Sequence, residues 1–406
     1  MLKIFIKKNL TVSLIIFLSL LAIILNFFRF FKNNAVYQFD PWLSNYQGGF
    51  VRRGLPGEIF FQLNEILNLH LGWFAFIFVC FLYIFFYFIF FNLIKEIKLN
   101  KTFIFCFFSP LAFYFPVLNS KASGHKEILF LFFLALFCFL LPKLKSQHAN
   151  YLMLIVSIFV TLSYEVLVFY LPYLVIAFIL FSNFNDMKKL FLNLVPIIIV
   201  FFFLVFINYI FKGTESHVHE ICNSIKLYVN PLCNEVGKIA DLKLSLSDHT
   251  SQKGQWNYGQ ASLYSSYLKI YLTGFVIGFL PLAILSWKSK ISQKINIFKY
   301  NPIFFLIIPF SSTLPVYYFG ADWGRYLYIS YMSSLILFIF CFKNEIFINY
   351  DSIKIFKINK ISKFIFILCV TIYGFAWTVP ICCENKFKLG ISTVIERVFY
   401  YYNKES

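Results

Sequence analysis

Arginine is rare in this chain, although the chain is strongly basic. Lysine outnumbers arginine by 31 to 5, and the formal net charge is +18. A guanidinium group matches a carboxylate or a phosphate with two parallel hydrogen bonds, which an ammonium group does not do. Because lysine is the usual cation of this chain, the few arginines predict a site for an anionic ligand. The five residues are Arg29, Arg52, Arg53, Arg325 and Arg397.

Other ionisable residues lie at the ends of apolar segments. They belong to the sequences Gly124-His-Lys-Glu127, Tyr164-Glu165 and Asp322-Trp-Gly-Arg325. An ionisable residue held near membrane depth is a functional candidate by default. We predict that four cations grip a diphosphate: Arg52, Arg53, Lys126 and Arg325. We expect a carboxylate to act on a sugar hydroxyl as general base, from Asp40, Glu165 or Asp322. The supporting residues are His125, Glu127, Glu58 and Trp323.

Each of these positions also has a purely structural interpretation. Asp322 and Arg325 are spaced to pair at the start of a helix, and Asp40 precedes a proline, as turn residues often do. Glu127 suits the first turn of a helix, where the helix dipole favours a carboxylate. The adjacent arginines could lie in a solvated loop or contact lipid headgroups.

The composition is that of a protein embedded in a membrane. The chain has 406 residues, is 60% hydrophobic and 13% charged, and has a mean hydropathy of +0.74. Several runs approach the roughly 20 apolar residues that cross a bilayer as a helix. We therefore predict an all-α, polytopic transmembrane bundle forming a single domain over 1–406. About eleven spans are expected, at 10–28, 72–94, 102–118, 127–141, 150–163, 166–181, 190–211, 267–286, 302–318, 327–342 and 364–383.

The distribution of lysine predicts the orientation of these spans. With the N-terminus in the cytoplasm, the short lysine-rich loops all fall on the cytoplasmic side, as the positive-inside rule requires. They lie at 95–101, 143–145, 188–189, 288–299 and 343–363. Two larger loops, 32–71 and 212–266, then lie outside, and 59–67 in the first suits a short interfacial helix. Orientation therefore explains the positive charge better than a nucleic-acid partner does.

The segment 150–181 is too long for one span. A helix of its 32 residues would measure about 48 Å, against a hydrocarbon core of about 30 Å. A single span would also place the lysines of 288–299 outside, against the positive-inside rule. We predict two short arms joined at Ser163-Tyr-Glu165, with Glu165 at the apex.

No motif indicates a nucleotide cofactor, a resident metal or a nucleic-acid partner. The phosphate-binding sequence GxxxxGK[ST] is missing from the chain. Neither a C-x-x-C motif nor a His/Cys cluster suggests a structural metal, and a divalent ion near Asp40 has no support. Cys222 and Cys233 could form a disulfide in an oxidising compartment. The sequence does not indicate an oligomeric state.

At these motifs the chain resembles multi-span inner-membrane proteins of bacterial surface-polysaccharide assembly. It is similar to O-antigen and capsule polymerases, and more loosely to GT-C glycosyltransferases. The resemblance rests on the plan of spans and outer loops and on Gly49-Phe-Val-Arg-Arg-Gly-Leu55, Gly124-His-Lys-Glu127, Tyr164-Glu165 and Asp322-Trp-Gly-Arg325. It implies a polyprenyl-phosphate-linked or polyprenyl-diphosphate-linked sugar, handled at the outer face. In the GT-C comparison Asp40 corresponds to the acidic residue of the first outer loop, although Phe-Asp-Pro-Trp lacks a paired acid.

We therefore expect a glycan-assembly enzyme of the bacterial cytoplasmic (inner) membrane, either a polymerase or a single-sugar transferase. Its expected partners are the bilayer and a polyprenyl-linked glycan. The alternative is a transporter or flippase of an anionic or lipid-linked substrate. Transporters often carry their polar residues near the midplane, whereas here these residues gather at one face. A scaffold without catalytic activity is a third interpretation.

Overall fold

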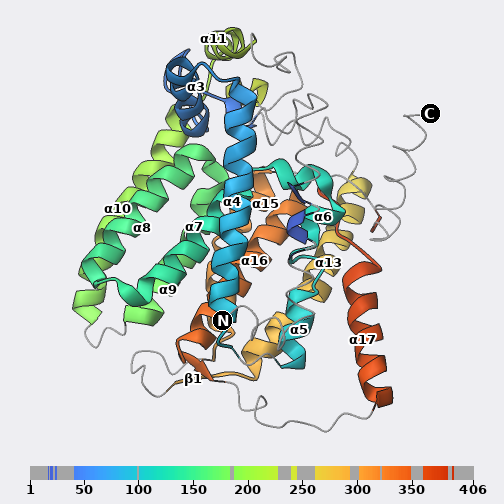
Figure 1. The fold of residues 1–406 in the computed structure, drawn as a ribbon. Helices are drawn as coiled ribbons and strands as arrows, with labels where there is room; N and C mark the ends of the chain where they lie inside the picture. The colour runs from blue at the N-terminus through green and yellow to red at the C-terminus, as the bar shows by residue number, and fades with distance from the viewer. Residues whose placement is uncertain are drawn as a thin grey trace, which may run out of the picture. The chain divides into compact units, whose positions relative to one another are not determined.

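The apolar runs of the sequence form α-helices in the computed structural model (Figure 1). The structure describes 41–97, 100–182, 187–226, 239–244, 261–292, 301–320, 322–348, 360–382 and 386–387, together with a few positions between 17 and 24. Over these residues the fold is all-α, apart from one antiparallel pair of two-residue strands. Predictions for Asp40, Arg29, Arg397 and most of the first span concern residues outside these ranges.

The chain divides into two compact units. The first contains 1–23, 93–123 and 253–406, and the second contains 24–92 and 124–252. We describe each unit by itself. The prediction of one transmembrane domain over the whole chain therefore stays a prediction.

Four helical segments of the second unit run in sequence and contact one another. They are α7 (Glu127–Leu140), α8 (Ser146–Ser163), the 3-10 helix η3 (Glu165–Tyr170) continuing into α9 (Pro172–Ser182), and α10 (Met187–Ile210). Helix α8 contacts α7, α9 and α10, and Figure 1 shows α8 and α10 running side by side. A second 3-10 helix, η2 (Leu141–Lys143), joins α7 to the loop before α8.

The segment 150–181, which was predicted to form two arms, is interrupted at the residues where the sequence predicted their joint. Tyr164 is extended, with φ −161° and ψ 110°, so helix α8 ends at Ser163. The chain then continues as η3, which contacts α8 again. Glu165 is the first residue after the break. The helix break thus places one carboxylate at the joint between the two arms.

The rest of the second unit contains most of α4 (Leu71–Ile94), which was predicted as the span 72–94, and three elements in the two loops expected at the outer face. These three are α3 (Leu55–Leu67), α11 (Glu215–Ile225) and the 3-10 helix η4 (Ala240–Lys243). Helix α3 was expected over 59–67 and begins earlier because Pro56 stands in its first turn, where proline is favoured. Helix α11 is capped by Thr214, whose hydroxyl accepts the backbone N–H of His217.

The first unit contains the remaining elements. They are α5 (Lys101–Phe107), α6 (Phe115–Leu118), η1 (Ser120–Gly124), α13 (Ala261–Trp287), β1 (Lys290–Ile291), α14 (Phe304–Ser311), α15 (Leu314–Phe319), α16 (Trp323–Lys343), β2 (Phe347–Ile348) and α17 (Lys360–Phe375). Helix α13 contacts α5 and α16. In the strand pair, Lys290 lies opposite Ile348 and Ile291 lies opposite Phe347.

Two predicted spans of this unit are not continuous helices. The segment 102–118 is divided into α5 and α6 at Ser109-Pro110. Proline lacks an N–H and disfavours helical geometry in the residue before it. The Ser109 hydroxyl accepts from the backbone of Leu111 and donates to the carbonyl of Gly278, which holds the break in place. The segment 302–318 is likewise divided into α14 and α15.

Five helical segments in the described part of the chain are long and apolar enough to cross a membrane. They are Leu71–Ile94, Glu165–Ser182, Lys188–Ile210, Tyr267–Trp287 and Trp323–Lys343. Many large apolar side chains on them are exposed, as lipid-facing residues are, and α10 is the clearest case, with Phe202 65% exposed. The expected count of eleven spans and their orientation stay predictions.

Candidate functional site

The two adjacent arginines lie in a tight loop that precedes α3. Gly49 adopts φ +119°, a left-handed conformation that glycine adopts without strain. The loop closes back on α3 at Gly57, where a Cβ atom would come within 2.0 Å of the carbonyl oxygen of Ser44. Gly49 thus allows the turn, and Gly57 allows the start of α3 to pack against the backbone of Ser44, in the loop from which Arg52 and Arg53 project.

Arg53 itself has a left-handed backbone, with φ 68°. This conformation costs of order 1 kcal/mol for a residue with a Cβ atom, and glycine or asparagine is the usual choice. A long cationic side chain at such a position indicates that the side chain is needed there. Its guanidinium also lies over the ring of Tyr164, 5.4 Å from the ring centroid, in the range of a cation–π contact.

Arg53 grips the carboxylate of Glu165 with two nitrogens. Its Nε donates to Oε1 at 2.9 Å and to Oε2 at 2.6 Å, and its Nη2 also donates to Oε1. This is the two-pronged geometry in which arginine binds carboxylates most strongly. The sequence placed these residues in separate roles, as diphosphate ligand and general base. In the structure they are first of all partners of one another.

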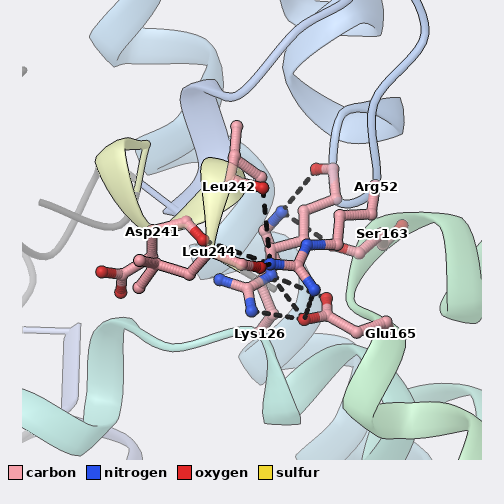
Figure 2. Close-up of polar contacts among 8 residues, drawn as sticks. Arg52, Lys126, Ser163, Glu165, Asp241, Leu242 and Leu244 are labelled. Carbon is pink, nitrogen blue, oxygen red and sulfur yellow. Dashed lines mark hydrogen bonds and ion pairs between the residues drawn. The ribbon is translucent and has the colours of Figure 1, made fainter. Parts of the chain in front are cut away.

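Arg52 points to a different set of acceptors. Its Nη2 donates to the carbonyls of Leu244 at 2.8 Å, Asp241 at 3.2 Å and Leu242 at 3.4 Å, all in or beside η4. Its backbone N–H donates to the carbonyl of Phe211 at 3.0 Å. Arg52 thus joins the arginine loop to the end of α10 and to η4. Figure 2 shows these carbonyls gathered around its guanidinium group.

Arg52 approaches Glu165 without bonding to it. The distance from its Nη1 to Oε1 of Glu165 is 3.9 Å, beyond hydrogen-bond range. Its Nε is buried and makes no hydrogen bond among the described residues. Arg52 therefore keeps unused donors beside a carboxylate that is already bonded to Arg53.

Lys126 completes the cluster from the residue before α7. Its ammonium donates to the backbone carbonyl of Ser163 at 2.8 Å and to that of Arg53 at 3.0 Å. It also lies 5.7 Å from the ring centroid of Trp42, whose indole N–H donates to the carbonyl of Gly124 at 2.7 Å. Lys126 thereby fastens the arginine loop to the helix break. Figure 2 shows Arg52, Lys126 and Glu165 converging on one place.

Burial and mutual charge decide how these cations hold their protons. Burial lowers the pKa of Arg52, and the charge of Glu165 offsets part of this effect. Burial alone would lower the pKa of Arg53, but the Glu165 carboxylate outweighs it and holds that pKa above its usual range. The pKa of Lys126 is held well below its ordinary value, mainly by burial and then by the charge of Arg53. The arginines therefore stay charged, and Lys126 is the member whose charge is costly.

Glu58 and the neighbours of Lys126 occupy other positions in this unit. The Glu58 carboxylate accepts the backbone N–H of Tyr46 at 2.9 Å and the side-chain amide of Gln62 at 2.8 Å, so it braces the loop against α3. His125 and Glu127 are buried on either side of Lys126, and Glu127 stands in the first turn of α7, as the helix-dipole interpretation expected.

Asp322, Trp323 and Arg325 belong to the other unit. Nη1 of Arg325 donates to the Asp322 carboxylate at 2.8 Å, which is the pairing that their spacing predicted. The indole N–H of Trp323 donates to the carbonyls of Tyr317 at 2.9 Å and Gly320 at 3.0 Å. Trp323 is buried, and these bonds fix the start of α16.

Several contacts of the cluster have no signal in the sequence. The carbonyls around Arg52 are backbone groups of η4, which lies 189 or more residues further along the chain. The carbonyl of Ser163 becomes available to Lys126 only because α8 ends there. The tryptophan in Asp40-Pro-Trp was visible as an aromatic residue next to the motif, but its buried position under Lys126 was not predictable.

The described residues hold no group of three or more His, Cys, Asp or Glu side chains that could bind a metal ion. Cys222 is part of a disulfide. Cys233, its predicted partner, lies outside the described residues. The candidate site therefore consists of Arg52, Arg53, Lys126 and Glu165, with Asp40 beyond the described part of the chain.

Comparison with known proteins gives no relative for this chain. No protein-family model, no curated protein and no solved structure matches it.

Proposed function

We propose that this protein is a multi-pass enzyme of glycan assembly in the bacterial cytoplasmic (inner) membrane. It transfers a sugar or an oligosaccharide from a polyprenyl-phosphate or polyprenyl-diphosphate donor at the outer face, as a polysaccharide polymerase or as a single-sugar transferase. Its partners are the bilayer and the lipid-linked glycan. The family resemblance stated above supplies the substrate class, and the cation cluster supplies the chemistry.

The observation that carries the proposal is the buried cluster of Arg52, Arg53 and Lys126 around one carboxylate, Glu165. Each buried charge costs several kcal/mol of desolvation unless it is well compensated. A chain that needed only a rigid joint could use apolar side chains of similar volume at lower cost. Grouping two arginines and a lysine beside helices apolar enough to cross a membrane suits the headgroup of an anionic lipid.

The reaction assigns a role to each charged group. The oxygen of an acceptor hydroxyl attacks the anomeric carbon of the donor sugar and forms the new glycosidic bond. The bond between that carbon and the phosphate oxygen breaks, and its electron pair leaves with the lipid (di)phosphate. Arginine and lysine stabilise the negative charge that develops on this leaving group. The hydroxyl proton passes to a carboxylate, for which Glu165 is the candidate beside the cations.

We expect Arg53→Ala to abolish long-chain surface polysaccharide while the protein accumulates at its normal level. Removing a donor to developing charge costs about a hundredfold or more in rate, and this substitution removes the fork that grips Glu165. The measurement is gel analysis of surface glycan chain length, with chemical analysis of the glycan, in a deletion strain complemented with wild type or variant.

The matched control is Glu65→Gln, which removes an exposed carboxylate on α3, outside the cluster. It should leave the glycan ladder unchanged. Single unpolymerised repeat units in the deletion strain would assign a polymerase, and a glycan lacking one sugar would assign a single-sugar transferase. A normal ladder in the Arg53→Ala strain would contradict the proposal.

A further inference from the structure

We infer that the Glu165 carboxylate occupies the position of a phosphate group in the cation cluster, and that an incoming phosphate or diphosphate displaces it from Arg53. Glu165 then takes the place of the ligand in the unloaded protein, and its carboxylate leaves Arg53 only when the ligand binds. This inference rests on the proposed function, because it specifies how the same site takes its substrate. The released carboxylate becomes the base of the reaction only in the loaded site.

The first support is that Glu165 satisfies only part of the cluster. Its two oxygens fill the fork of Arg53, but Nη1 of Arg52 remains 3.9 Å from the nearer oxygen. The Nε of Arg52 is buried and unbonded among the described residues. A phosphate group has the same two-pronged fit to arginine and a further oxygen. It can bond to Arg53 and to Arg52 together, which a carboxylate in this position does not do.

The second support is that Arg52, Lys126 and the backbone of Arg53 are held by bonds that do not involve the carboxylate. The backbone of Arg53 is held through its carbonyl by Lys126, which also donates to the carbonyl of Ser163. Arg52 is held by the carbonyls around η4 and by the bond from its backbone N–H to Phe211. None of these bonds uses Glu165. Displacing its side chain therefore leaves Arg52 and Lys126 in place and frees the guanidinium of Arg53 for an anion.

The third support is the way the cluster opens to the surface of its unit. The side chain of Glu165 is 18% exposed, against 11% for Arg53, 8% for Arg52 and 2% for Lys126. An anion that enters from the exposed side meets the carboxylate before the cations. Glu165 also follows an extended residue, at the start of a 3-10 helix. Glu165 therefore lies outside both α8 and α9.

The test is the binding of inorganic pyrophosphate to purified full-length protein in detergent, measured by calorimetry. Glu165→Gln keeps the size of the side chain but removes the competing charge. We expect it to bind pyrophosphate about tenfold tighter than wild type, because a charge-assisted pair no longer has to be broken. Equal or weaker binding by Glu165→Gln would overturn the inference.

Two further variants keep the test decisive. Glu65→Gln removes an exposed carboxylate of α3 that lies outside the cluster, and its pyrophosphate affinity should equal that of wild type. If Glu165→Gln does not fold, Glu165→Asp replaces it, because a carboxylate shorter by one methylene holds the Arg53 fork less well. It should also bind pyrophosphate more tightly than wild type, and unchanged or weaker binding would overturn the inference.

A second probe, farnesyl diphosphate, separates the two sources of such a headgroup. If the natural ligand is a lipid headgroup, wild type should bind farnesyl diphosphate more tightly than pyrophosphate, and equal affinities would indicate a free phosphate compound. Tighter binding by Glu165→Gln together with a normal glycan in the deletion strain would reject the proposed function but keep the anion site. Loss of glycan without tighter binding would reject the exchange but keep the function.

Discussion

At the scale of single residues, the two adjacent arginines bind different partners. Arg53 binds the carboxylate of Glu165, while Arg52 donates to the backbone carbonyls in and beside η4. Nη1 of Arg52 lies 3.9 Å from Glu165, beyond hydrogen-bond range. Lys126 is the least exposed of the cations, and its ammonium donates to the backbone carbonyls of Arg53 and Ser163. Its lowered pKa means that the folded protein releases this proton more easily than the unfolded chain does.

We predict that Lys126→Met changes how stability depends on pH. Between the lowered pKa of Lys126 in the folded protein and its ordinary value of about 10.4, the unfolded chain binds more protons than the native state. Wild-type stability therefore gains a contribution that rises with pH in this window, and the variant lacks it. The melting temperature of wild type should increase relative to that of Lys126→Met as the pH is raised from about 7 to about 10.

The control for this measurement is Lys145→Met, which removes an exposed lysine in the loop before α8. Its melting temperature should follow that of wild type across the same range. A melting temperature of wild type that stays constant or falls relative to that of Lys126→Met over this range would contradict the assignment of Lys126 as a destabilised buried cation.

At the scale of elements, two features bring the cluster together. The break at Tyr164 turns a 32-residue apolar segment into two arms and places Glu165 at their joint. The turn at Gly49 and the close packing of Gly57 against Ser44 bring the arginine loop to that joint. Lys126 is the residue immediately before α7, and it joins the cluster from that position. The charged side chains therefore come from helix ends, whose unpaired backbone carbonyls also supply the acceptors.

We expect Gly57→Ala to weaken both folding and the site. Alanine is ordinarily preferred to glycine within a helix by about 1 kcal/mol. Here its Cβ would lie 2.0 Å from a backbone oxygen, that of Ser44, which no change of rotamer can relieve. Such overpacking costs about 1–3 kcal/mol, so the clash outweighs the helix preference. The measurements are the melting temperature and the affinity for pyrophosphate, and both should fall.

Glu65→Ala provides the comparison on the same helix, because Glu65 is exposed on α3. An exposed substitution of this kind changes stability by no more than about 0.5 kcal/mol. A Gly57→Ala protein as stable as Glu65→Ala would show that the loop does not depend on this close contact.

The sequence predicted much of the helical fold and part of the site. The long runs at 72–94, 190–211, 267–286 and 327–342 are helices because apolar composition dominates there. The hairpin followed from length, since one helix of 150–181 would overshoot the bilayer. The cluster of Arg52, Arg53, Lys126 and Glu165 followed from placing rare charged groups at one face.

The remaining features depend on geometry that residue types do not determine. The pairing of Arg53 with Glu165, 112 residues apart, requires the tertiary structure. The acceptors of Arg52 and Lys126 are backbone carbonyls, which every residue has. Pro110 is a signal in the sequence for the division of 102–118 into two helices. The flanking residues are so apolar that the segment was predicted as one continuous span.

At the scale of the whole molecule, the chain combines a basic, largely apolar composition with two helical units. Each unit carries one arginine–carboxylate pairing: Arg53 with Glu165, which the sequence did not predict, and Arg325 with Asp322, which its spacing predicted. Around the first pairing, Lys126 donates to the backbone carbonyl of Arg53, and Nη1 of Arg52 lies 3.9 Å from Glu165. We therefore propose that the chemistry of lipid-linked glycan transfer takes place in the second unit.

The most direct test of this assignment is a transfer reaction in vesicles that contain purified protein and a polyprenyl-diphosphate-linked oligosaccharide. We predict that wild type forms a new glycosidic product and free polyprenyl diphosphate, and that Arg53→Ala forms neither, while Glu65→Gln matches wild type. Movement of intact substrate across the vesicle membrane without a glycosidic product would contradict the account and indicate a transporter.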